Sequence, residues 1–131
     1  MFKGTITNVT SVVGTNIPIA VQFNTNGNTN YNNAESAIRL LTSGFYDVNV
    51  TLNITGSTPT TIGAQLFADG IAIPETLVQT DITATTGRAT LNISDVFRVV
   101  PQYTNTFAEL SLQLDGVATI DNGIVTVEKV R

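Results

Sequence analysis

The feature that most constrains the fold of this chain is a strict alternation of apolar and polar side chains between residues 46 and 55. The apolar positions are Tyr46, Val48, Val50, Leu52 and Ile54, and every residue between them is Asp, Asn or Thr. Successive side chains of a strand point to opposite faces, whereas a helix would distribute these five around its circumference. The pattern therefore predicts a half-buried antiparallel strand with a fixed register, because a slip of one residue would expose all five apolar groups.

Turn signals divide the rest of the sequence into short segments rich in β-branched residues. Asp69-Gly70 supplies the positive φ values of a type I′ turn, so the segments on either side of it should form a hairpin. Ser94-Asp95 is expected to be a turn, and Asp121-Asn122-Gly123 is expected to break or bulge its strand. The further strands that we expect cover residues 5–13 (at a sheet edge), 17–23, 37–41, 62–68, 71–73, 77–83, 89–93, 96–100, 108–114, 118–120 and 124–130.

Eight to ten short strands among these segments, with no convincing helix, predict an all-β fold, an antiparallel β-sandwich of the jelly-roll type. Strand spacing alone leaves an immunoglobulin-like sandwich open, but the chain has no Cys and no Trp for the buried set typical of that fold. At 131 residues and 13.9 kDa, one domain is expected. Residues 1–16 would form an N-terminal strand or arm, and residues 17–131 would form the core sandwich.

The composition combines few charges with a positive mean hydropathy of +0.19. Charged residues make up 12% of the chain, about half of the usual ~25%. The domain therefore either buries extra surface against copies of itself or has a neutral outer surface rich in Thr and Asn. Both features are typical of assembled extracellular or virion β-proteins.

The residue inventory excludes most catalytic chemistry. The chain has no His and no Cys, which rules out Ser–His and Cys–His catalysis and the usual zinc sites. A carboxylate pair remains formally open, but several Asp residues occupy turns, and Asp121-Asn122-Gly123 is interpreted as a turn rather than a calcium site. We therefore expect no enzyme, no catalytic residue, no cofactor and no metal site.

Charge and hydropathy also limit the partners. A net charge of −4 and a pI of about 4.4 argue against nucleic-acid binding, which uses a basic surface. No apolar run approaches the roughly 20 residues of a membrane span, so membrane insertion is not expected. No signal-peptide core follows Met1, so export by that route is not indicated.

Residues 24–33 form a ten-residue segment with six Asn, which predicts a surface loop. Its candidate contact residues are Asn26, Asn28, Tyr31 and Asn32. A Tyr31 ring that simply packs on the base of the loop is the preferred alternative for that residue.

Two aromatic residues lie at positions that alternation would turn away from the core. Gln65 and Phe67 face opposite to Leu66, which indicates either a subunit contact or a hairpin with both faces inside the sandwich. We favour the subunit contact. Phe97, between Val96 and Arg98, poses the same question.

Gly44-Phe45-Tyr46-x-Val48 resembles the Gly-x-Tyr-x-apolar opening of the central strand in the tumour necrosis factor (TNF) and complement globular-head jelly rolls. Residues 65–74 and the ending 124–130 are similar to the short prokaryotic relatives. Those relatives occur on phage heads as head-fibre or decoration proteins, and at the tips of collagen-like bacterial surface filaments. The resemblance covers roughly residues 17–130.

The resemblance implies a ten-stranded jelly roll that forms a compact homotrimer and displays a binding or shielding surface on a virion or cell. Capsid protein or a host surface glycan or receptor would be the outside partner. A monomeric carbohydrate-binding module is the alternative; it needs exposed aromatics, and the chain offers only Tyr31, Tyr46 and Tyr103 besides Phe. The residues expected at the trimer interface are Gln65, Phe67, Tyr46, Phe97 and Phe107.

Overall fold

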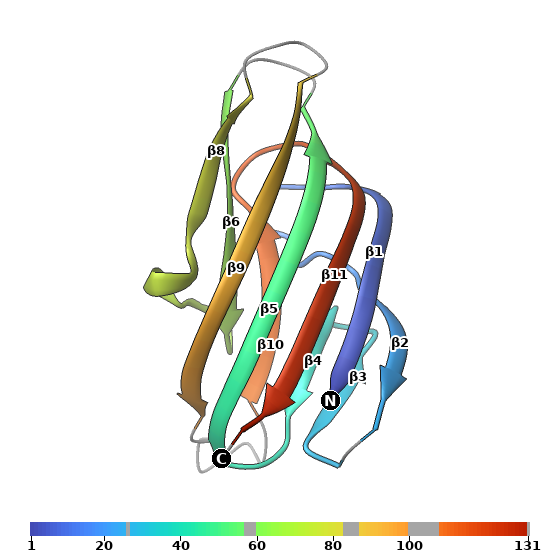
Figure 1. Cartoon of the computed structure of the whole chain (residues 1–131), viewed down its shortest axis with the longest axis vertical. Helices are drawn as coiled ribbons and strands as arrows, with labels where there is room; N and C mark the ends of the chain where they lie inside the picture. Colours follow the sequence, from blue (N-terminus) through green and yellow to red (C-terminus); the bar gives the residue numbers. More distant parts are fainter. Residues whose placement is uncertain (26, 57–59, 83–86, 100–107, 131) are drawn as a thin grey trace.

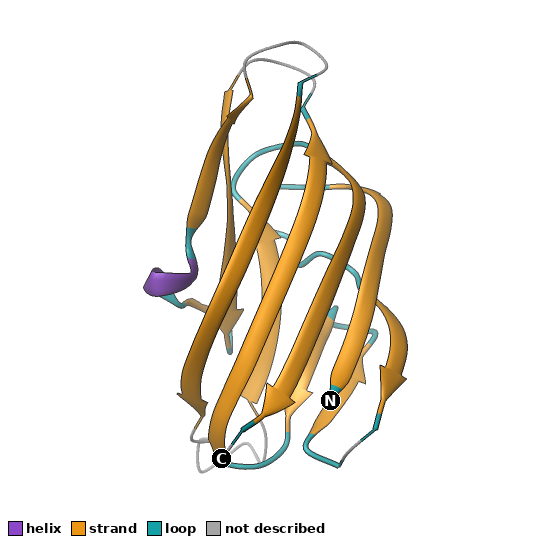
Figure 2. Ribbon diagram, viewed as in Figure 1, coloured by secondary structure: helices purple, strands orange, loops and turns teal. Residues whose placement is uncertain are grey.

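The computed structural model describes residues 1–25, 27–56, 60–82, 87–99 and 108–130, and nearly all of its regular structure is strand (Figure 2). The only regular element in this part of the chain that is not a strand is a 3₁₀ turn, η1 (Pro74–Thr76). The strands are β1 (Phe2–Thr10), β2 (Ala20–Asn24), β3 (Thr29–Asn32), β4 (Ala37–Leu40), β5 (Gly44–Thr55), β6 (Thr60–Ala68), β7 (Ile71–Ala72), β8 (Val78–Ile82), β9 (Arg88–Val99), β10 (Ala108–Leu114) and β11 (Thr119–Lys129).

The strands form two antiparallel sheets that pack face to face (Figure 1). Sheet A has the order β2-β1-β11-β5-β9, and sheet B has the order β3-β4-β10-β6-β7 with β8 also paired to β6. In Figure 1 the long strands of sheet A lie in front, with β10 and β4 of sheet B behind them. The structure is thus an antiparallel β-sandwich of the jelly-roll type, as the sequence predicts.

The core lies between the sheets and is centred on β5. All five apolar side chains of the alternating segment are at most 1% exposed, and the residues between them point away from the core. On the facing strand β10, Leu110, Leu112 and Leu114 are equally buried. The period-two prediction for β5 is confirmed and follows from the pleat of a half-buried sheet, and β10 covers the strand expected at residues 108–114.

Two local predictions are also confirmed. Asp69 and Gly70 have φ values of 52° and 80°, the positive pair that a type I′ hairpin turn between β6 and β7 requires. In β11 the pairing with β5 shifts register between Ile120 and Asn122, so the segment is a bulge within one continuous strand.

Three strand predictions are wrong. β1 is not at an edge, because β2 and β11 pair on either side of it. Ser94-Asp95 is not a turn, because β9 continues through it; Ser94 pairs with Asn49 and donates a hydrogen bond to that side chain at 2.8 Å. Residues 24–33 are not a single loop, because β3 occupies 29–32 and pairs with β4.

Candidate interaction surfaces

The Asn-rich segment 24–33 uses its side chains to hold the chain together. The Tyr31 hydroxyl accepts a hydrogen bond from the backbone N–H of Ile19 at 2.9 Å. The Tyr31 ring stacks on Phe2 with the ring centroids 6.3 Å apart. The ring is therefore packed against the core, as in the alternative that the sequence favoured for this residue.

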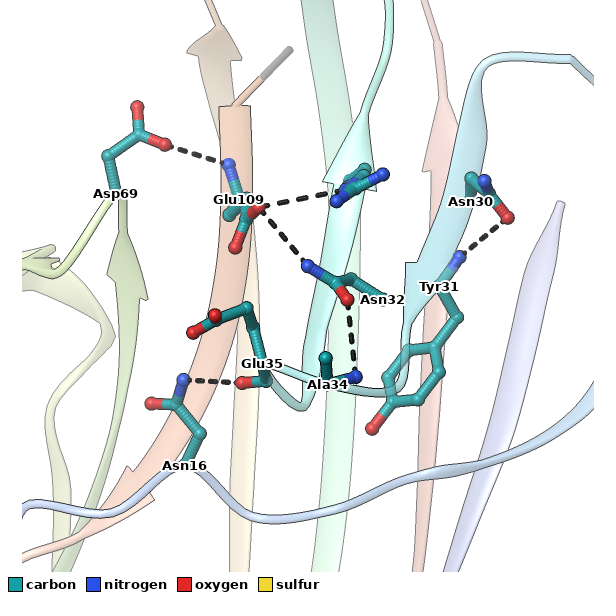
Figure 3. Close-up of polar contacts among 9 residues, drawn as sticks. Asn16, Asn30, Tyr31, Asn32, Ala34, Glu35, Asp69 and Glu109 are labelled. Atoms are coloured by element: carbon teal, nitrogen blue, oxygen red, sulfur yellow. Dashed lines mark hydrogen bonds and ion pairs between the residues drawn. The ribbon is translucent and has the colours of Figure 1, made fainter. Parts of the chain in front are cut away.

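Two Asn side chains of this segment have similar roles. Asn28 accepts a hydrogen bond from the Thr42 hydroxyl at 3.0 Å. Asn32 accepts one from the backbone N–H of Ala34 at 3.2 Å, and its amide donates to Glu109 at 3.5 Å (Figure 3). Asn26 lies outside the described residues. A contact role for these positions stays a prediction.

Of the residues expected at a trimer interface, those that the structure describes do not form one patch. Tyr46 is 0% exposed and its hydroxyl donates to the backbone carbonyl of Thr42 at 2.7 Å, so it belongs to the core and offers no surface to a second subunit. Phe97 pairs with Tyr46 and packs against the same core from β9. Phe107 lies outside the described residues.

Gln65 and Phe67 do point outward, from the outward face of sheet B. They line a hollow of about 190 Å³ together with Val13 and Leu77, both of them exposed. The Gln65 amide donates to the backbone carbonyl of Ile73 at 3.2 Å. These two residues therefore lie on the side of the sandwich opposite to sheet A.

Sheet A has a large outward face whose centre carries no charge. Across β1, β11, β5 and β9 the register aligns three rows of outward side chains. Apart from Lys3 at the end of one row, the side chains in these rows are uncharged: Thr5, Thr7, Asn49, Thr51, Asn53, Thr90, Asn92, Ser94, Asn122, Ile124 and Thr126. We call this set the neutral face.

Hydrogen bonds between side chains link the strands across the neutral face. Asn53 is at their centre: its amide donates to Asn122 at 2.6 Å, and its carbonyl oxygen accepts from Thr90 at 2.8 Å. Thr51 donates to Asn92 at 3.0 Å in the neighbouring row. These bonds hold the exposed side chains in defined rotamers.

Charged side chains surround the neutral face. Their positions are Lys3, Asp47, Arg88, Arg98, Asp121 and Glu128. The face was missed at the sequence level, although the uncharged outward positions of residues 49–53 were a signal for it. The sequence does not give the register of the neighbouring strands. The register shows that β1, β9 and β11 contribute uncharged residues to the same rows as β5.

Within the described residues, no group of three or more His, Cys, Asp or Glu side chains could hold a metal ion. Nor does that part of the chain contain a helix long and apolar enough to cross a membrane.

No protein-family model and no curated protein matches this sequence. Solved structures do match the fold. The structure of Eiger TNF from S. frugiperda superposes with a TM-score of 0.75 over 99% of this chain and 93% of that chain, at 10% identity. The chain has the TNF-like jelly-roll fold.

Two further TNF-like jelly rolls match over nearly their whole length. Murine APRIL, in a crystal structure at pH 5.0, gives a TM-score of 0.67 at 8% identity and covers 95% of this chain and 98% of that chain. The PRD1 vertex protein P5 gives 0.63 at 14% identity and covers 99% and 96%. None of the three is named for an enzymatic activity. At these identities the likeness concerns the fold.

Proposed function

We propose that this protein is a non-enzymatic structural and display protein: a homotrimeric jelly-roll head on a phage capsid, as a head fibre or decoration, or on a cell surface. It would mediate attachment or shielding through its outer loops and sheet B. The observation that carries the proposal is the neutral face of sheet A. A TNF-like fold shared with a vertex protein supports the setting.

The neutral face has the properties of a protein–protein interface. The centres of such interfaces are depleted of charged residues, and their rims are polar and solvent-accessible. Here the charges lie around the face, while Ile124 at its centre is 46% exposed in the single chain. The hydrogen-bonded rotamers also lower the entropy lost when side chains are ordered by association. Burying this face against another copy accounts for a chain with only 12% charged residues.

A closed three-fold ring needs a heterologous contact between two different patches of each subunit. Patches on opposite, parallel faces of a slab would stack copies into an open column instead. The patch that meets the neutral face must therefore lie at an edge of the sandwich. Phe67 and Gln65, on the outward face of sheet B, do not meet this condition, and we propose that they stay outside the trimer contact.

The alternative of a monomeric carbohydrate-binding module has less support. Sugar rings stack on exposed aromatic faces. Tyr46 is buried, and Tyr31 uses its ring against Phe2 and its hydroxyl on Ile19. No described Tyr is thus presented as a free platform.

A matched pair of substitutions tests the position of the interface. Ile124 and Ile71 are both exposed, at 46% and 73%, but Ile124 is on the neutral face and Ile71 is on β7 of sheet B. Ile124→Arg places a charge at the centre of the proposed contact. We expect it to convert the trimer to monomers in sedimentation velocity, while Ile71→Arg sediments as the wild type. Both variants should keep the β-sheet circular dichroism spectrum.

Phe67→Asp is the third variant of this test, and it places a charge on the outward face of sheet B. If the neutral face forms the contact, this variant stays trimeric. Dissociation by Phe67→Asp with retention of the trimer by Ile124→Arg would move the interface to sheet B and contradict the proposal.

A further inference from the structure

The hollow of about 190 Å³ on the outward face of sheet B is lined mainly by apolar groups, and we call it the apolar hollow. The residues of β6 that line it are Gly63, Gln65 and Phe67. Val13, in the connection between β1 and β2, and Leu77, which follows η1, line it from two other segments. Val13 is 58% exposed and Leu77 is 44% exposed, so the apolar hollow presents carbon atoms to solvent.

Hydrogen bonds hold both of these segments against sheet B. The connection between β1 and β2 is fixed by the Ile17 N–H, which donates to the Leu112 carbonyl at 2.8 Å. The η1 turn is fixed by the Thr76 hydroxyl, which accepts a hydrogen bond from the Leu66 N–H at 3.0 Å. The apolar hollow is thus formed in the single chain. An occupant would not have to order its walls, which lowers the cost of binding.

The size of the apolar hollow suits one large side chain. A cavity of about 150 Å³ holds a benzene molecule, whereas sites for drug-sized ligands usually measure about 300–1,000 Å³. Protein–protein interfaces are commonly anchored by single side chains that fill pockets of the partner. The volume therefore favours a protein side chain over a cofactor or a larger small molecule.

The polar side chains that line the apolar hollow have partners within the chain. The Gln65 amide donates to the Ile73 carbonyl at 3.2 Å, and the Gln113 amide donates to Asn16 at 2.9 Å. Apart from Asp115, the other described side chains of the lining are aliphatic or aromatic. The group that fills the hollow should therefore be apolar.

Asp115 adds a negative charge to the lining. Its Oδ1 atom accepts a hydrogen bond from the Gly63 N–H at 2.6 Å, and a Cβ atom added to Gly63 would lie 2.6 Å from its Oδ2 atom. The glycine therefore lets the carboxylate lie directly against β6, where any side chain would displace it. No basic side chain among the described residues pairs with Asp115. Its second oxygen can accept a hydrogen bond from a cation of a partner.

The charge of the surrounding sheet has the same sign. In the described residues, sheet B and its connections have one basic residue, Arg39, which pairs with Glu109 at 3.6 Å. The acidic residues of sheet B and its connections are Glu35, Asp69, Glu75, Asp81, Glu109 and Asp115. A basic segment of a partner would be attracted to this side of the molecule at long range.

A second copy of this chain does not meet these requirements. Its sheet B has the same acidic charge. Copies joined through both faces of the sandwich would also stack into an open column rather than a closed ring. This step rests on the proposed function, in which the neutral face forms the trimer contact. The occupant therefore belongs to another protein.

We propose that the apolar hollow binds one large apolar side chain, Phe or Leu, of a partner protein that presents it between Lys or Arg residues. The apolar group fills the hollow, and the flanking cations face Asp115 and the acidic residues around it. The site lies on the sheet opposite to the neutral face. Its occupation can therefore be measured whether or not the chain forms a trimer.

The test titrates the full chain with the peptide acetyl-Lys-Phe-Lys-amide at low salt. Acetyl-Lys-Ala-Lys-amide lacks the apolar group, and acetyl-Glu-Phe-Glu-amide reverses the charge. In NMR spectra of methyl-labelled protein, the Phe peptide with Lys should shift the signals of Val13, Leu77 and Leu114 and leave those of Ile71 in place. It should bind about tenfold more tightly than the Ala peptide, and about 0.5 M salt should weaken it. The Glu peptide should bind more weakly than the Lys-Phe-Lys peptide.

Substitutions then locate the site. Leu77→Ser and Val13→Ser each remove apolar surface from the hollow and should weaken binding of the Lys-Phe-Lys peptide about three- to tenfold. Ile71→Ser removes a side chain of the same sheet that is 73% exposed but does not line the hollow, and it should leave binding unchanged. Asp115→Asn keeps an acceptor for the Gly63 N–H and should weaken binding about two- to threefold.

Equal binding of the Lys-Phe-Lys and Lys-Ala-Lys peptides, or equal weakening by Leu77→Ser and Ile71→Ser, would overturn the proposal. So would binding of the Glu peptide as tight as that of the Lys-Phe-Lys peptide. A lower native mass of the Leu77→Ser variant would place a second copy in the hollow and would also overturn it. A monomeric wild type that binds the Lys-Phe-Lys peptide at these methyl groups would contradict the trimer alone, and a trimer that does not bind it would contradict only the site.

Discussion

At the scale of single residues, the two described Tyr hydroxyls are structural. Tyr46 reaches across the end of the sandwich and donates to the backbone carbonyl of Thr42, with the carbonyl of Asn28 at 3.4 Å. The Tyr31 hydroxyl accepts a hydrogen bond from the backbone N–H of Ile19, the residue before β2. Both rings lie against the core, so each hydroxyl satisfies a backbone group that β-pairing leaves without a partner.

Removing either hydroxyl should therefore lower stability without changing the shape of the core. We expect Tyr46→Phe and Tyr31→Phe each to reduce the free energy of unfolding by about 1–2 kcal/mol, because a partly buried backbone group loses its partner. Urea denaturation at one fixed protein concentration measures this. A Tyr31→Phe variant with the wild-type midpoint would contradict the stabilising role of the Tyr31 hydroxyl.

Single residues are also where the sequence predicts the structure least well. The six Asn of 24–33 predict a loop because Asn favours turns, but Tyr31 pairs with Ile38 in a strand. Tertiary pairing overrode local propensity there. The alternation of residues 46–55 predicts Tyr46 on a buried face, whereas the trimer expectation places it at an interface; only the buried position agrees with its complete burial.

At the scale of elements, the period of two in β5 is enough to predict that strand and its buried face. β9 was divided wrongly because Ser94-Asp95 resembles a turn. In the structure, Asp95 takes an inward position opposite Val48, where a polar residue interrupts an otherwise apolar series. From the sequence alone, a polar residue at an inward strand position looks the same as a turn residue. The continuous pairing of β9 with β5 shows that the strand runs through Asp95.

Two glycines give a prediction that separates backbone strain from crowding. Gly70 has a φ of 80°, and a Cβ atom added to it would have no neighbouring atom within 4 Å. A Cβ atom added to Gly123 would lie 2.8 Å from Leu52 Cδ2 and 3.1 Å from the Thr51 carbonyl oxygen. Gly70→Ala should cost about 1 kcal/mol of stability from the left-handed backbone alone.

Gly123→Ala should cost about 1–3 kcal/mol from overpacking at the bulge. Replacing Leu52 by Ala in the Gly123→Ala background makes room for the methyl group. The double variant should therefore be more stable than the two separate losses predict, and strict additivity would contradict the crowding. No such rescue is expected for Gly70→Ala.

At the scale of the whole molecule, the sandwich has two chemically different sides. The low charge content predicted either a self-contact or a neutral surface, but it could not show where. The register of four strands locates the neutral face on sheet A, and the acidic residues gather on sheet B. The apolar hollow could not be predicted, because it joins residues 13, 63, 77 and 115, which are distant in sequence.

The native mass of the wild-type protein tests the central claim most directly. Multi-angle light scattering at micromolar concentration and moderate salt should give about 42 kDa, three times the 13.9 kDa of one chain. A single species of 13.9 kDa would leave the neutral face open to solvent and would contradict the trimeric display head.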